Sequence, residues 1–314
     1  MNAALWFRLG LFIDSPPVWV FLSTGGRIPA QNITRLLAPF SGATAANLVP
    51  EIDQLKLGSY LFPHLDPYID QKQGKRIRNL FLDIYREMEK DAAFVEAGSA
   101  LGMCYADLFA GRRPALHFYQ YVPRHLGKKA YPVLVFLHGS LGNFKGYSWV
   151  LKDLADAEGY AILAPTYGSG NWHLDRDGAI LTAVYNHCVE DAALDHRTIY
   201  LAGLSNGGLG VSREMQRAAG RYAGFAFISP VMEAHLISTV SALDSMKGKT
   251  VLILHGEKDR RIPVAAIRTC EGILKNAGLP TTAHYEPNED HFLFFAQRDA
   301  VLQNIAAWLR ENGN

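Results

Sequence analysis

The chain has almost no charge imbalance and few cysteines, and both shortages narrow the range of functions. Lys and Arg total 31 against 30 Asp and Glu, which leaves a formal net charge of +1. So small a charge provides no basic surface, so we expect neither nucleic acid nor an anionic membrane as a partner. The three cysteines, Cys104, Cys188 and Cys270, are an odd number without metal-type spacing. We therefore expect reduced structural thiols, no metal and no cofactor.

The sequence also lacks a hydrophobic run long enough to cross a membrane. The most apolar stretch, Leu9 to Phe21, is interrupted by Asp14 and the pair Pro16-Pro17 before about 20 apolar residues accumulate. It has neither the charged start nor the small-residue cleavage site of an export signal. We expect no stable membrane insertion and a cytoplasmic location, with secretion left open.

From about Leu116 onward, short apolar or β-branched runs alternate with amphipathic segments. The runs predict strands at His117–Val122, Pro132–Leu137, Tyr160–Ala164, Thr198–Ala202, Gly224–Ile228, Thr250–Leu254 and Thr281–Tyr285. The segments between most of them predict helices at Trp149–Ala157, Ala179–Cys188, Val211–Ala219, Ala265–Ala277 and Ala300–Leu309. This alternation predicts an α/β fold with a doubly wound, mostly parallel sheet, in which ligands bind beyond the carboxyl ends of the strands.

The N-terminal third is irregular and punctuated by Pro and Gly. Its strongest signal is an apolar stripe that predicts a helix from Lys75 to Val95, followed by a second helical candidate over Ala97 to Phe109. A Gly-Arg-Arg-Pro stretch then indicates a junction. We divide the chain into a mainly helical extension, residues 1–112, and an α/β domain, residues 113–314. The extension is expected to be a lid, a packing element or the contact of a homodimer, and the sequence leaves these alternatives open.

The most informative motif is Gly203-Leu204-Ser205-Asn206-Gly207, which follows a predicted strand and opens a predicted helix. A side chain held at so sharp a strand-to-helix turn needs neighbours without a β-carbon, and two glycines flank the serine. The helix that follows directs unpaired amides and its positive dipole end at any negative charge formed there. The motif predicts that Ser205 is a nucleophile.

A serine nucleophile needs a base to take its proton and an acid to orient that base. Asp259 follows the strand that ends near Leu254, and we expect it to be the acid, with Glu257 in the same loop as its competitor. His291 lies in a polar turn after the last predicted strand, and we expect it to be the base. The order Ser, Asp, His after successive strands favours this assignment, whereas Asp290 is too close in sequence to orient its own neighbour.

The oxyanion formed on attack needs backbone donors. The run Leu137-His138-Gly139-Ser140-Leu141-Gly142 carries an apolar strand into a glycine-bracketed loop. We expect the amide of Ser140 or of Leu141 to donate one hydrogen bond and the amide of Asn206 to donate the other. His138 is interpreted as a hydrogen-bonded strut of the loop rather than as a second base.

Taken together, the runs Leu-His-Gly-Ser-Leu-Gly, Gly-Leu-Ser-Asn-Gly-Gly, His-Gly-x-x-Asp-x-x-Ile-Pro and Asp-His-Phe resemble the α/β-hydrolase superfamily. They are most similar to its carboxylesterase, phospholipase and dienelactone-hydrolase members and to the catalytic domains of prolyl-oligopeptidase-like peptidases. The match covers roughly residues 116–309. The resemblance implies an acyl-transfer enzyme in which Ser205, His291 and Asp259 form a catalytic triad, but it does not fix the acyl or the leaving group.

Substrate signals are thinner. Residues 231–249 are too few for the helical cap that encloses long acyl chains in many lipases, so open access is expected from that side. Leu141, Phe144, Tyr167 and Trp172 are expected to line the substrate pocket. We expect small-molecule esters of short-chain or aromatic acids to be the substrates. The alternatives are a prolyl-oligopeptidase-like peptidase or acyl-aminoacyl hydrolase and, from another class, a non-catalytic binding protein of the same fold.

Overall fold

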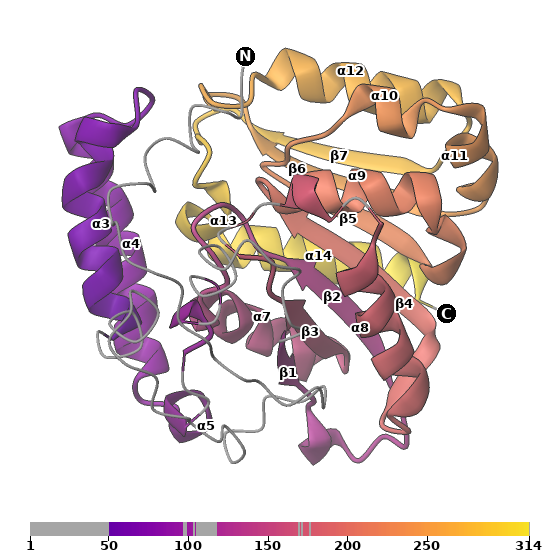
Figure 1. Ribbon diagram of the computed structural model, residues 1–314, viewed down its shortest axis with the longest axis horizontal. Helices are drawn as coiled ribbons and strands as arrows, with labels where there is room; N and C mark the ends of the chain where they lie inside the picture. Colours follow the sequence, from indigo (N-terminus) through magenta and orange to yellow (C-terminus); the bar gives the residue numbers. More distant parts are fainter. Residues whose placement is uncertain are drawn as a thin grey trace.

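A central β-sheet organises the molecule. The computed structural model describes residues 50–96, 99–102, 104, 118–168, 170, 172–175 and 177–313. Seven strands pair in the order β1-β3-β2-β4-β5-β6-β7 (Figure 1). All neighbours are parallel except β1 and β3, which are antiparallel. This confirms the predicted doubly wound, mostly parallel sheet. The strands are β1 (Phe118–Tyr121), β2 (Tyr131–Leu137), β3 (Ala161–Pro165), β4 (Leu194–Leu204), β5 (Gly224–Ile228), β6 (Thr250–Gly256) and β7 (Thr281–Glu286).

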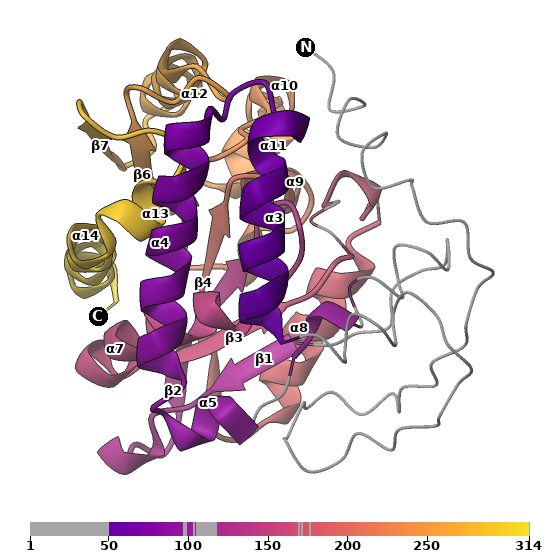
Figure 2. The same cartoon turned by 90° about the vertical axis from the view of Figure 1, so that its left-hand side faces the viewer.

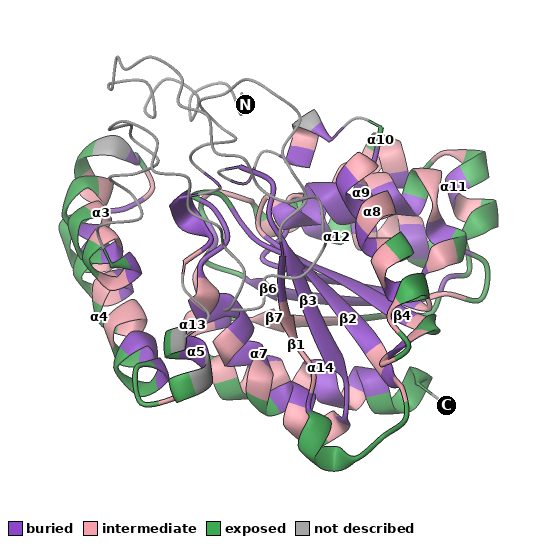
Figure 3. Cartoon of the chain, turned by 60° about the horizontal axis from the view of Figure 1, so that its bottom comes forward, coloured by how far each residue is buried: buried purple, intermediate pink, exposed green. Residues whose placement is uncertain are grey.

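Helices cover both faces of the sheet, and the central strands are mostly buried, with exposed residues only near the start of β4 (Figure 3). One face packs against α8 (Ala179–Glu190), α9 (Gly207–Arg217), α10 (Ala234–Ile237), α11 (Val240–Ser245) and α12 (Val264–Asn276). The other packs against α7 (Lys145–Glu158), α13 (Leu293–Ala296) and α14 (Arg298–Asn312). Short 3-10 turns occur at Arg124–Leu126, Trp172–Leu174 and Ala219–Arg221.

The side chains of each strand alternate between two separate cores. In β2, Val133, Val135 and Leu137 join the core under α8 and α9, whereas Leu134 and Phe136 join the core under α7 and α14. Because successive strand residues point to opposite faces, a run that is apolar throughout must be buried on both sides. The helices predicted from the alternation in this region are all present, with small shifts at their ends.

A helical hairpin precedes the sheet, formed by α3 (Glu51–Leu65) and α4 (Gln71–Met88) and followed by the short α5 (Ala92–Glu96). The two long helices lie side by side and cross in front of the strands (Figure 2). The helix predicted over 75–95 is wrong in extent, because a capping box between Asp70 and Gln73 starts α4 earlier and a turn after Met88 ends it. The helix α3 was not predicted at all, since Gly58 and Pro63 interrupt its pattern.

Several predictions fall outside the described residues. The predicted junction at residues 111–114 and most of the helical candidate over 97–109 lie there. The homodimer contact stays a prediction, although α4 packs against α7 and α13 of its own chain. Within the part of the chain that the structure describes, no helix is both long and apolar enough to cross a membrane.

A buried carboxyl group fastens the hairpin to the α/β domain. Glu51, at the start of α3, accepts hydrogen bonds from the hydroxyl of Tyr85 in α4, from Ser99 Oγ at 2.6 Å and from the Lys145 amide at 3.1 Å. The Lys145 amide belongs to the first turn of α7, whose N-cap residue Phe144 offers no side-chain acceptor. Burial raises the pKa of Glu51, against the lowering effect of these hydrogen bonds. Glu51 therefore caps α7 from a different helix.

Replacing Glu51 tests this attachment. Glu51→Ala leaves several buried donors without an acceptor, so we expect the free energy of unfolding to fall by about 2 to 4 kcal/mol in chemical denaturation. The control is Asp53→Ala in the same helical turn, where an exposed carboxylate pairs with Lys56 at 2.8 Å. That control should lose less than about 1 kcal/mol. Equal losses in the two variants would show that Glu51 does not hold the hairpin in place.

Candidate active site

Ser205 lies at a strained turn between β4 and α9. Its φ is 51°, in the left-handed region that side chains other than Gly rarely adopt. The turn is so tight that a β-carbon at Gly203 would lie 2.5 Å from the Gly207 backbone, and one at Gly207 would lie 2.2 Å from the Leu137 carbonyl oxygen. Both glycines are therefore required sterically. The turn places Ser205 directly after the carboxyl end of β4, and backbone hydrogen bonds to Ile228 and Val231 hold it there.

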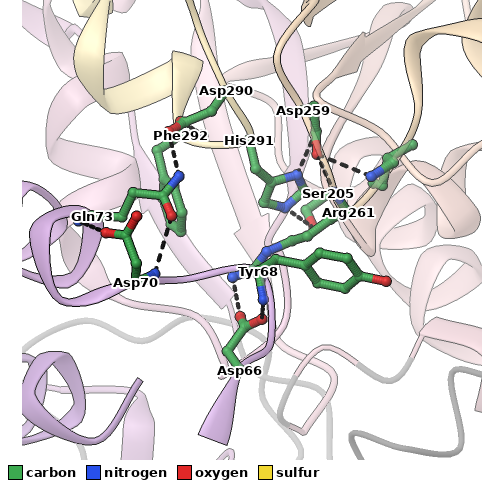
Figure 4. A network of polar contacts seen from close by, with 11 residues as sticks. Asp66, Tyr68, Asp70, Gln73, Ser205, Asp259, Arg261, Asp290, His291 and Phe292 are labelled. Atoms are coloured by element: carbon green, nitrogen blue, oxygen red, sulfur yellow. Dashed lines mark hydrogen bonds and ion pairs between the residues drawn. The ribbon is translucent and has the colours of Figure 1, made fainter. Parts of the chain in front are cut away.

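A continuous hydrogen-bonded chain connects Ser205, His291 and Asp259 (Figure 4). His291 Nε2 lies 2.9 Å from Ser205 Oγ, and His291 Nδ1 lies 2.7 Å from Asp259 Oδ2. The three residues follow β4, β6 and β7, whose carboxyl ends meet at one edge of the sheet. The structure thus brings together the three side chains that the sequence proposed as nucleophile, base and acid.

The environment of Asp259 keeps its carboxylate charged. Burial alone would raise the pKa of Asp259, but the charge and hydrogen bond of His291 and the backbone amide of Ile262 hold that pKa below its usual value. The second carboxylate oxygen accepts the amides of Arg261 and Ile262, each at 2.9 Å. A buried carboxylate with these donors can orient an imidazole and stabilise its positive charge.

The competing carboxylates are directed elsewhere. Glu257 pairs with Arg268 at 2.5 Å on the surface. Asp290 pairs with Arg76 of α4 at 3.0 Å. Neither of these pairs involves His291, so of the three carboxylates weighed for the acid it is Asp259 that contacts the imidazole.

The loop after β2 lies directly against Ser205. A β-carbon on Gly139 would be 3.3 Å from the Ser205 β-carbon, and Leu141 turns the loop with a φ of 82°. Among the described residues, the backbone amides of Ser140, Leu141 and Asn206 have no hydrogen-bond partner. Unpaired amides beside a serine hydroxyl are what an oxyanion requires.

His138 supports this loop from below. Its side chain is fully buried, with Nδ1 donating to the Gly139 carbonyl at 2.8 Å and Nε2 accepting the Tyr167 amide at 3.1 Å. Burial lowers the pKa of His138 to about 4, so the ring is neutral at pH 7. Both ring nitrogens are occupied by the backbone, which agrees with the interpretation of a strut.

Tyr167 and Trp172 do not occupy the place expected from the sequence. Both are buried, and the Trp172 indole donates to the His138 carbonyl at 2.9 Å while its amide donates to Asn206 Oδ1 at 3.1 Å. A buried indole needs such a partner, and this one lies behind the loop rather than in front of it. The two aromatic side chains therefore brace the turn and do not line the pocket described next.

Ser205 and His291 lie in a pocket that is open to solvent, and the space among its lining residues amounts to about 670 Å³ with the adjoining solvent included. Ser140, Leu141 and Phe144 line it, as expected from the sequence for Leu141 and Phe144. The prediction missed half of the lining residues, which come from the hairpin, from the loops after β6 and β7 and from α13. These are Leu55, Phe62, Asp66, Ile69, Phe81, Arg261, Phe292 and Phe295. The capping box at Asp70 was a signal that could have located α4, but no sequence signal placed the hairpin over the serine.

No cluster of His, Cys, Asp or Glu in the described ranges is arranged to hold a metal ion. The three cysteines are buried and form no disulfide.

The chain resembles a curated esterase over part of its length. Over 162 residues it is 26% identical to the bifunctional acetylxylan esterase/xylanase XynS20E of Neocallimastix patriciarum. This match covers 50% of the chain but only 23% of that relative. No protein-family model matches the sequence.

Solved structures share the architecture. Est1E from Butyrivibrio proteoclasticus, also known with ferulic acid bound, has a TM-score of 0.51 at 18% identity over 63% of this chain and 94% of that one. The acylaminoacyl peptidase of Pyrococcus horikoshii has a TM-score of 0.52 at 15% identity over 63% of this chain and 39% of that one. Together with the strand order and the connections of the sheet, these neighbours establish that the chain has the α/β-hydrolase fold, which is the fold that its motifs imply.

Proposed function

We propose that the protein is a serine hydrolase that cleaves small-molecule carboxylic esters. The observation that carries this proposal is the hydrogen-bonded chain from Ser205 through His291 to Asp259, which opens into a pocket. The curated relative described above is an acetylxylan esterase and xylanase by name, which supports an ester rather than an amide as the substrate. The apolar lining supports a short-chain or aromatic acyl group.

The reaction follows from the geometry. Ser205 Oγ attacks the ester carbonyl carbon while His291 Nε2 takes its proton, and Asp259 stabilises the resulting imidazolium. The amide of Asn206 and one of the adjacent amides of Ser140 and Leu141 donate to the oxyanion. Collapse of the tetrahedral intermediate expels the alcohol, which receives the proton from His291. Water activated by His291 then hydrolyses the acyl-enzyme and restores Ser205.

A peptidase or acyl-aminoacyl hydrolase is the second candidate, because the Pyrococcus horikoshii peptidase shares the fold. The same triad and oxyanion donors would serve an amide. We favour the ester because the curated relative that matches half of this chain is an esterase by name. A non-catalytic binding role is the weakest alternative, since it leaves the aligned hydrogen bonds of Ser205 and His291 without a purpose.

Covalent labelling tests the enzyme proposals together. A fluorophosphonate should label Ser205 at neutral pH, and Ser205→Ala should abolish labelling, because only an activated serine reacts at an appreciable rate. Mass spectrometry of the labelled peptide is the measurement. No adduct on Ser205 would refute both the esterase and the peptidase. If labelling succeeds, faster cleavage of aminoacyl-nitroanilides than of p-nitrophenyl esters would favour the peptidase instead.

The two carboxylates near β6 provide a matched pair for the acid. Asp259→Asn should lower kcat by about ten-thousand-fold, because the amide no longer holds the imidazole in the productive tautomer. Glu257→Gln should change kcat by less than about two-fold, since its partner is Arg268 on the surface. Steady-state rates on one p-nitrophenyl ester decide the matter, and the reverse ranking would reassign the acid to Glu257.

The strut role of His138 predicts a pH effect on stability. Its pKa is about 4 in the folded protein and about 6.5 when unfolded, so the unfolded chain binds the proton first as the pH falls. The associated stability is complete above pH 6.5 and is lost toward pH 4, by on the order of 3 kcal/mol. Chemical denaturation at pH 6.5 and at pH 4 should show a smaller drop in the free energy of unfolding for His138→Gln than for the wild type. The exposed His125→Gln is the control, and an unchanged loss in His138→Gln would contradict the role.

A further inference from the structure

The hairpin forms one apolar wall of the pocket that contains Ser205. Leu55 and Phe62 come from α3, Ile69 from the connection and Phe81 from α4. The Phe81 ring packs on Phe295 of α13 with 4.6 Å between centroids, which closes the wall against the α/β domain. Apart from Asp66, which is paired with Arg261, the hairpin side chains that line this space are hydrophobic and mostly large.

The loops that carry the proposed acid and base each hold the hairpin by ion pairs. The pair between Asp66 and Arg261 is shown in Figure 4. Arg261, two residues after Asp259, forms an ion pair with Asp66 at the end of α3. Arg76 of α4 pairs with Glu289 at 2.5 Å and with Asp290 at 3.0 Å, directly before His291. The hairpin is therefore fixed to the same loops that position the reacting groups.

The Asp66–Arg261 pair is shielded from water, with side-chain exposures of 1% and 18%. Arg261 also stacks over the Phe292 ring at 5.4 Å, and Asp66 Oδ1 accepts the Tyr68 amide at 2.9 Å. A shielded pair with additional partners holds its geometry better than an exposed one, and breaking it leaves a buried charge. The apolar wall is thus formed before substrate binds, so that binding does not have to order it.

We propose that the α3–α4 hairpin is the specificity cap of this active site and selects esters that carry a bulky apolar group over esters of small groups. The proposal rests on the function proposed above. An acetyl or ethyl group offers little apolar surface to this wall, whereas a phenyl ring would bury its faces against Phe62, Ile69 and Phe81. Phe62 and Ile69 are the specificity-determining residues contributed by the cap.

Three simple esters test the cap. The reference among them is ethyl acetate, which has no aromatic group on either side of the ester bond. Ethyl acetate has no bulky group, ethyl phenylacetate carries a ring on the acid side, and benzyl acetate carries it on the alcohol side. The wild type should hydrolyse at least one aromatic ester with a kcat/KM roughly ten-fold or more above that for ethyl acetate. The preferred aromatic ester also identifies which side of the ester bond lies under the cap.

The variants then locate the preference. Phe62→Ala and Ile69→Ala should each lower the ratio of kcat/KM for the preferred aromatic ester to that for ethyl acetate by about ten-fold. The control is Leu61→Ala, because Leu61 neighbours Phe62 on α3 but is 45% exposed and does not line the pocket. The ratio in this control should equal that of the wild type. Since each variant is judged by a ratio, partial loss of folded protein cancels.

The outcomes separate the cap from the proposed function. No preference for either aromatic ester in the wild type overturns the cap. A preference that Phe62→Ala, Ile69→Ala and Leu61→Ala all retain also overturns it, while ester hydrolysis itself stands. If the wild type hydrolyses none of the esters and a fluorophosphonate leaves Ser205 unmodified, the proposed function fails instead.

Discussion

Taking the carboxylate of Asp259 out of water costs several kcal/mol unless its oxygens find donors, and much of the site is arranged to supply them. The loop after β6 folds back so that the amides of Arg261 and Ile262 serve one oxygen. The loop after β7 brings the His291 ring to the other. With the ring held there, its second nitrogen lies at hydrogen-bond distance from the Ser205 hydroxyl. The tight turn after β4 provides that position for the hydroxyl. The buried carboxylate of Asp259 thus sets the relative positions of the loops after β6 and β7 and of the turn after β4.

The same loops also determine where the cap lies. Because Arg261 follows Asp259 by two residues, its backbone amide helps to orient the carboxylate while its side chain reaches Asp66 of the hairpin. Asp290 similarly precedes His291 and binds Arg76. Substrate selection and the orientation of the proposed triad therefore rest on a shared set of contacts. If the hairpin moved, it would pull on Arg261 and Asp290, which lie within two residues of Asp259 and His291.

Much of this arrangement could be predicted from the sequence because it depends on local signals. Each strand, the turn at Ser205 and the loops of Asp259 and His291 can be recognised from a few neighbouring residues. The order of these short motifs along the chain then predicts the triad. The cap did not, because the Arg261–Asp66 pair joins positions 195 residues apart and neither residue is unusual where it stands. The prediction that Trp172 lines the pocket was wrong for a related reason. A tryptophan after a glycine-rich turn predicts an aromatic contact, but not whether the ring points into the pocket or behind the loop.

The helix α3 shows how tertiary contacts override weak local preference. Gly58 and Pro63 disfavour a helix in isolation, yet the carboxyl group of Glu51 at its start receives buried donors from α4 and α7, and the pair at Asp66 secures its end. The short segment between β5 and β6 forms only α10 and α11, which pack on α9 and do not line the pocket. Because the segment between β5 and β6 does not line the pocket, the wall beside Ser205 comes from another part of the chain. In this molecule it comes from a helix pair that precedes the sheet, and the buried carboxyl groups of Glu51 and Asp66 hold the two ends of its first helix.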